Sequence, residues 1–168
     1  MMVRSWPGSW LLLVLLLAGP ALADPPWPEQ GWEVKVTSQG YAELLNALRS
    51  AVESEGMFVV MEVGPTEAAA RRGESIPGNR VVGVFRNDYA VRTLRLSIPA
   101  MIEAPIRFYV TENEDGSTTL AWKRPSHVLA PYIEEGGEGL EEIGRELDAV
   151  FSAIATKAVR APEPAQPD

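Results

Sequence analysis

The feature that most constrains the fold is the stretch formed by residues 104–123, which has the pattern of two β-strands joined by a tight turn. Phe108 and Val110 alternate with polar residues, the period of two expected when one face of a strand is buried. The return strand places Leu120 and Trp122 on one face, and an Asp-Gly turn tolerates the positive backbone angles of a hairpin. A hairpin alone is marginally stable, so the chain must supply further strands or a covering helix.

The remaining periodic segments predict these partners. Residues 41–55 and 140–159 each carry one apolar stripe at helical spacing, which predicts two long helices. Further strands are expected at residues 33–37, 57–63 and 80–85, and shorter helices at residues 66–72 and 88–96. Because residues 57–63 are almost entirely apolar, we expect them to form a central strand. The short joins between strands favour an α+β fold, with an antiparallel sheet of about five strands and two long helices on one face.

The ends of the helix over residues 41–55 can be predicted from single residues. A glycine in a later strand indicates a local irregularity. Thr37 or Ser38 is expected to cap this helix, and Gly56 to end it. Gly83, inside a strand, marks a bulge or a close backbone approach.

The helix over residues 88–96 is expected to be capped by Asn87. Its residues Tyr89, Val91 and Leu94 are expected to turn inward. The burial of these three side chains depends on the predicted orientation of the helix.

The amino terminus predicts export. Residues 1–23 combine Arg4, a short apolar run and an Ala-x-Ala site, and so predict a signal peptide cleaved near Ala23-Asp24. An uncleaved anchor is the alternative, but the run is short for a bilayer and no stable membrane anchor is expected. A proline-rich leader (residues 24–32), a single domain (33–159) and a disordered tail (160–168) follow, with Trp27 and Trp32 of the leader available to pack on the domain. The protein is therefore expected in the periplasm or secreted.

Composition excludes several functions. The chain has no cysteine, which removes thiol catalysis, thiolate metal sites, Fe–S clusters and covalent haem attachment. Its formal net charge of −8 opposes binding to nucleic acid, which requires a basic surface.

Over about residues 33–159 the sequence resembles a bacterial family, the domain of unknown function 302. The resemblance lies in the helix and strand of residues 41–60, in residues 81–87 and 98–112, in the Asp-Gly turn with the segment that follows it to Pro125, and in the closing helix. It implies a TATA-binding-protein-like α+β fold, β-α-β(4)-α in outline, and often a homodimer. The family brings no catalytic residues. This chain has Gly64-Pro65 where the family often has Asp-His.

Residues 123–139 contain two prolines and three glycines and are expected to form a long, functional connection. The only histidine, His127, lies there, and we expect it to bind a ligand together with Tyr132 and Met101. The leading hypothesis is an exported, non-enzymatic binding module, homodimeric, whose partner is a small ligand or a periplasmic protein.

Two other functions remain open. His127 could bind haem or copper, with two copies meeting across a dimer axis. A hydrolase would also have to use His127, but the sequence has no G-x-S-x-G motif and Ser126 stands in no recognisable nucleophile setting.

Overall fold

The structure is a computed structural model that describes residues 27–160. The predicted signal peptide and nearly all of the predicted tail lie outside these residues. Five strands form one antiparallel sheet in the order β1-β5-β4-β3-β2. The strands are β1 (Trp32–Thr37), β2 (Phe58–Val63), β3 (Asn79–Phe85), β4 (Ile106–Glu112) and β5 (Thr118–Lys123). The hairpin predicted from residues 104–123 is β4 and β5, at the middle of the sheet.

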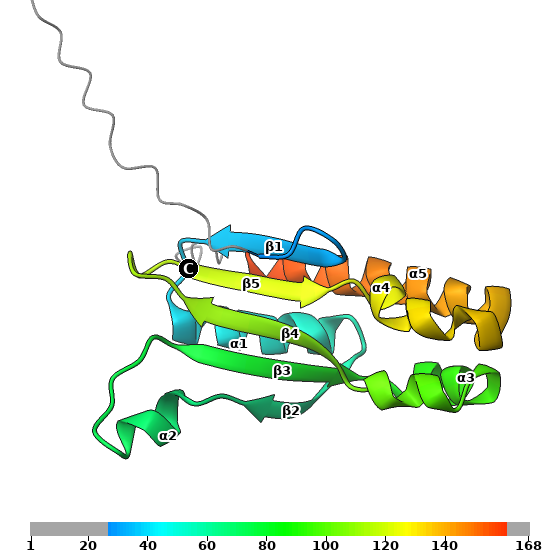
Figure 1. Ribbon diagram of the computed structural model, residues 1–168. Helices are drawn as coiled ribbons and strands as arrows, with labels where there is room; N and C mark the ends of the chain where they lie inside the picture. Colours follow the sequence, from blue (N-terminus) through cyan, green and yellow to red (C-terminus); the bar gives the residue numbers. More distant parts are fainter. Residues whose placement is uncertain (1–26, 161–168) are drawn as a thin grey trace, which may run out of the picture.

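Two long helices, α1 (Tyr41–Ser54) and α5 (Ile133–Ala158), cover one face of this sheet, and the opposite face is open toward the viewer in Figure 1. The shorter helices are α2 (Thr66–Ala70), α3 (Asn87–Leu96), η1 (Pro99–Glu103), α4 (Pro125–Leu129) and η2 (Ala130–Tyr132). The predicted α+β fold with two long helices on one face is therefore confirmed. Across residues 27–160, no helix has both the length and the hydropathy needed to cross a bilayer.

The core lies between the sheet and the two long helices. Phe108 is fully buried and stacks on Phe151 of α5, with ring centroids 4.7 Å apart, while its cross-strand partner Trp122 lies 5.6 Å away. Leu147 is also buried, as the helical stripe predicts. Burial of a large apolar side chain contributes about 1.5–3 kcal/mol, so this cluster joins the hairpin to α5.

The end of α1 follows the prediction, but its start does not. Gly56 has a φ of +68°, and the amide of Met57 donates to the carbonyl of Val52, the hydrogen bond that closes a Schellman motif. At the other end the N-cap is Gly40, which has no side chain to donate a cap, and Thr37 Oγ1 accepts from the amide of Gln39, not from the helix. The expected Thr37 or Ser38 cap is therefore wrong.

The expectation of a central strand at residues 57–63 is also wrong, because β2 lies at the edge of the sheet. Phe58 is 62% exposed, and Val60 and Val63 are about half exposed. The pairing of β2 with β3 shifts between Val59 and Met61. Such a bulge is common at sheet edges, where it disrupts pairing with other chains. A nearly apolar strand thus arises here at the edge of the sheet.

The expected long connection at residues 123–139 is largely helical. Pro125 opens α4 and Pro131 falls in the first turn of η2, where a missing amide hydrogen is tolerated. Gly137 has a φ of +59° and kinks α5 near its start. Prolines and glycines that resemble a loop in the sequence therefore start and bend helices.

The orientation predicted for α3 is only partly right. Tyr89 is buried, but Leu94 is 49% exposed and Val91 is also exposed. Asn87 is the first helical residue and does not cap the helix, because Arg86 occupies the N-cap position. Helix α3 extends past the end of the sheet and meets α5 on one side only, so its apolar stripe is not fully covered (Figure 1).

Candidate functional site

The open face of the sheet carries a hollow of about 560 Å³. Its wall and floor include Trp32, Val81, Arg107, Tyr109, Ala121 and Lys123, which come from four strands. Small-molecule sites usually have volumes of roughly 300–1,000 Å³ and a few polar groups on mostly apolar walls. The hollow therefore has the size and composition of a ligand site.

The register of the strands explains why these side chains meet. In β4 and β5 the odd-numbered residues face away from the core, because Phe108 and Trp122 face into it. Tyr109 is directly opposite Ala121, and Ala121 is opposite Val34 of β1. A small residue thus separates two strands that carry larger side chains, which leaves space above β5.

Two cations lie side by side at the hollow. Continuing the ladder one position beyond Phe108 and Trp122 makes Arg107 and Lys123 neighbours across β4 and β5. Neither forms an ion pair with a carboxylate anywhere in residues 27–160, and Lys123 Nζ lies 5.5 Å from the centre of the Trp32 ring. Like charges at neighbouring cross-strand positions are destabilising. In a chain with 23 acidic and 15 basic residues, two adjacent cations that lack a carboxylate partner in residues 27–160 indicate a site for an anion.

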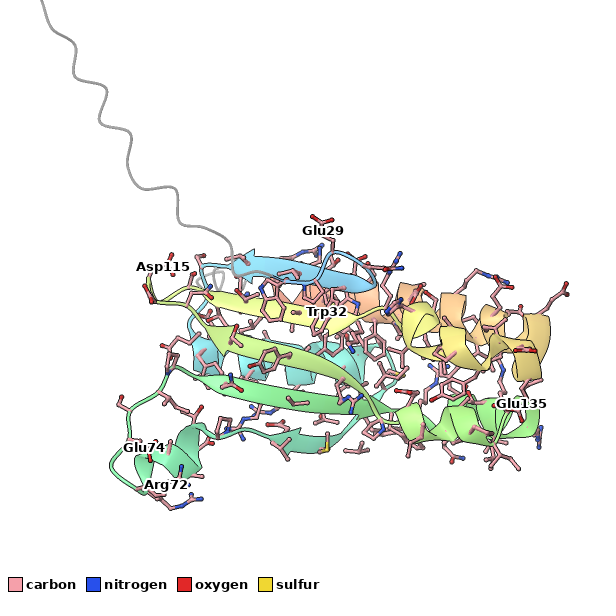
Figure 2. All side chains as sticks on the ribbon, viewed as in Figure 1. Glu29, Trp32, Arg72, Glu74, Asp115 and Glu135 are labelled. Carbon is pink, nitrogen blue, oxygen red and sulfur yellow. The ribbon has the colours of Figure 1, made fainter. Side chains whose placement is uncertain are left out.

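Aromatic side chains form the apolar part of the site. The Trp27 ring lies 5.5 Å from that of Trp32 and 5.9 Å from that of Tyr109. Tyr109 is held in place by Asn79, whose amide nitrogen donates to the phenol oxygen at 2.5 Å. Figure 2 shows Trp32 on the β1 side of the sheet, with Glu29 beyond the edge of that strand.

The segment before β1 is fixed at Gly31, which explains the position of His127. Gly31 has a φ of +79°, and its carbonyl accepts from the amide of Arg124 at 2.8 Å. A Cβ added at Gly31 would lie only 2.2 Å from the His127 ring, so this ring packs directly on the Gly31 backbone. His127 is otherwise exposed and does not line the hollow.

The Ser126 hydroxyl is used to hold α4 on α5. Asp148 accepts from the backbone amide of Ser126 at 2.9 Å and from its Oγ at 2.5 Å. In a hydrolytic triad a histidine accepts from the serine hydroxyl, and the acid accepts from the other ring nitrogen of that histidine. Here the acid bonds the serine directly, an arrangement that caps a helix.

The other two predicted site residues lie at the end of the sheet near α3. Met101 lines a crevice of about 50 Å³, too small for a cofactor or drug-sized ligand. Tyr132 Oη donates to Glu103 Oε1 at 2.8 Å, and this hydrogen bond raises the pKa of Tyr132. The structure brings Met101 and Tyr132 to the same η1 segment through Glu103, but it does not bring His127 to them. Within residues 27–160 no three His, Cys, Asp or Glu side chains are grouped as metal ligands.

The sequence contained a signal for the hollow. The alternation that buries Phe108 requires Arg107 and Tyr109 to lie on the opposite face. The missing information was the order of the strands, which sets β5 with Lys123 between β4 and β1.

Comparisons with known proteins agree with the fold. Residues 32–154 match the family described as domain of unknown function DUF302. A crystal structure of an uncharacterized conserved DUF302 protein from Bacillus stearothermophilus superposes with a TM-score of 0.68, at 18% identity, over 78% of this chain and 99% of that one. A search of curated proteins finds no match. The family match spans the whole sheet and most of both long helices, and on that basis the chain belongs to the DUF302 family.

Proposed function

We propose that this protein is a non-enzymatic binding module that holds a small organic anion in the hollow on the open face of its sheet. The observation that carries the proposal is the pair formed by Arg107 and Lys123, adjacent cations at the hollow that form no ion pair with a carboxylate of residues 27–160. A carboxylate placed between them would remove their mutual repulsion and accept charge-assisted hydrogen bonds.

Two other arginines, unlike Arg107, are paired with carboxylates. Arg49 is paired with both oxygens of Glu62, and Arg92 with both oxygens of Glu146. These pairs join elements to one another, so their charges are already satisfied. Within the described part of the chain Arg107 and Lys123 form no such ion pair, so their charges can act on a ligand.

The test is calorimetric titration with carboxylates and their uncharged analogues. Hexanoate and benzoate are expected to bind, and hexanol and benzyl alcohol are not. Arg107→Gln and Lys123→Gln should each weaken binding roughly 10- to 100-fold, because a hydrogen bond to a charged group contributes about 1.5–3 kcal/mol.

Arg95→Gln is the matched control. Arg95 is exposed on α3 and its replacement removes the same charge away from the hollow. If this variant weakens binding as much as Arg107→Gln does, the effect comes from overall charge and the hollow is not the site. Equal binding of benzoate and benzyl alcohol would contradict the proposal as well.

We also propose that the protein works in the periplasm or outside the cell, as a homodimer. Export is supported by the signal-peptide pattern of residues 1–23, and dimerisation by the family resemblance. Amino-terminal sequencing of the exported protein should give Asp24 as the first residue. Light scattering should give twice the mass of the mature chain, and a monomer at high concentration would refute the dimer.

A further inference from the structure

The indole of Trp27 lies beside two aromatic residues that line the hollow, Trp32 and Tyr109. Its centre is 5.5 Å from the Trp32 ring on β1 and 5.9 Å from the Tyr109 ring on β4. Strand β5 runs between those two strands, and the residue it presents to this face between them is Ala121. The indole therefore lies against two aromatic side chains whose strands flank β5, next to the part of the hollow that Ala121 lines.

One polar atom of Trp27 lacks a hydrogen-bond partner in residues 27–160. Its indole nitrogen, Nε1, is buried and has no hydrogen-bond acceptor among residues 27–160. A buried donor without an acceptor is destabilising, and such groups are rare in folded proteins. The rings around Trp27 thus attract its flat surface, while its polar atom finds no partner there.

The segment that carries Trp27 is weakly attached. Residues 28–30 are exposed, and within the described part of the chain no hydrogen bond joins residues 27–30 to the sheet. The first attachment is at Gly31, whose φ of +79° and bond to the amide of Arg124 fix the start of β1. Trp27 can therefore leave its position by rotation of the backbone before Gly31, without loss of any strand pairing.

We propose that Trp27 occupies the position of the ligand's own ring, so that the ligand is a flat aryl carboxylate. The ring of this ligand would displace Trp27 from between Trp32 and Tyr109, and its carboxylate would reach Arg107 and Lys123. The displaced indole would regain a hydrogen bond from its N–H to water. This inference rests on the proposed function and adds the chemical class of the ligand and a competing side chain.

Competition by Trp27 makes a quantitative prediction. A site closed by its own side chain about nine-tenths of the time has an apparent affinity about tenfold lower than the open site. Trp27→Ala should therefore strengthen the binding of 2-naphthoate about tenfold, while Trp27→Phe should bind as the wild type does or slightly more tightly. Hexanoate has no ring to compete for the position, so its affinity should change less than threefold.

Titration calorimetry of the wild-type protein and both variants with 2-naphthoate and hexanoate is the experiment. In a parallel titration with the wild type, the fluorescence of Trp27 should shift toward that of exposed tryptophan, a change absent from Trp27→Phe. Weaker naphthoate binding by Trp27→Ala would make Trp27 part of the site and overturn the competition, as would equal affinity. If neither carboxylate binds any of the three proteins, the proposed function fails too, whereas hexanoate binding alone would refute only the aryl class.

Discussion

Gly83 of β3 is closely packed on the face of the sheet opposite the long helices. A Cβ built on it would lie 2.8 Å from Pro105 Cγ and 3.2 Å from Met61 Cβ, so only a hydrogen atom fits. The sequence predicted a bulge or a close backbone approach at this position. The bulge lies in the partner strand β2, opposite Gly83, and the close contacts come from the side chains of Pro105 and Met61 instead of from a backbone.

We predict that Gly83→Ala lowers the free energy of unfolding and that Gly83→Val lowers it further. Overpacking of this kind usually destabilises by about 1–3 kcal/mol, because Pro105 and the β2 backbone would have to shift. Denaturant unfolding of the three proteins measures the difference. Wild-type stability of the valine variant would show that Pro105 does not cover the strand.

Residue-level prediction succeeded where one strand or helix face decides burial. Phe108, Trp122 and Leu147 are buried as expected, because alternation or helical spacing determines which side of an element they occupy. It failed for Leu94, which has the correct helical spacing but lies on a part of α3 that nothing covers. A pattern identifies an apolar face, and the three-dimensional neighbours decide whether the face is buried.

At the scale of elements, α3 is held on α5 by one charged cluster. Arg92 makes two hydrogen bonds to Glu146, at 2.7 and 2.8 Å. The buried ring of Tyr89 lies against Arg86, whose guanidinium carbon is 4.3 Å from the ring centre, and near Arg92. The bond from Arg92 holds the pKa of Glu146 below its ordinary value.

This pair makes part of the stability depend on acid pH. A carboxyl group whose pKa is lowered by folding stabilises the fold above its unfolded pKa, and that stabilisation disappears as the pH falls through its folded pKa. Glu146→Gln should therefore be less stable than the wild type at pH 7, by a few tenths to about 1 kcal/mol for a pair this exposed. The difference should shrink as the pH falls below about 4.5.

Urea unfolding of both proteins at pH 7, 5 and 3 measures this difference. Glu142→Gln is the control, because it removes the same charge from α5 and no ion pair of Glu142 is present in residues 27–160. A difference that stays constant down to pH 3 would mean that the Glu146 charge does not hold α3.

Whether a segment forms a helix or a strand could be predicted from the sequence better than its position in the fold. The hairpin, α1 and the carboxyl-terminal part of α5 were predicted within a residue or two, because each has a clear period and a clear end such as Gly56. Residues 57–63 were placed at the centre of the sheet because apolar strands are usually covered on both faces. The prolines and glycines of residues 123–139 predict a loop, but in the structure they occupy helix starts and the kink at Gly137.

At the scale of the whole molecule, the sheet has two unlike faces. One packs on α1 and α5, and the other carries aromatic, small and cationic side chains around the hollow. The first face could be predicted from single strands. The second requires the strand order, since Arg107 and Lys123 are 16 positions apart in the sequence and become neighbours only through the β4–β5 pairing. For this reason the sequence alone does not predict the candidate site, and its only histidine, His127, predicts a site that the hollow does not include.

The single core predicts that the sheet and its covering helices unfold together. Phe151 stacks on Phe108 at 4.7 Å, so one aromatic contact joins α5 to the central hairpin. Phe151→Ala should lower the free energy of unfolding by about 3–5 kcal/mol, the usual range for a fully buried phenylalanine. Tryptophan fluorescence, which includes Trp122 in this core, and far-UV circular dichroism should then give one shared midpoint for the wild type and one shared, lower midpoint for the variant.

Leu94→Ala, on the exposed part of α3, should change the midpoint far less. Separate fluorescence and dichroism transitions in the wild type would show that α5 and the sheet fold as independent units, and that the open face with its hollow is held by the sheet alone.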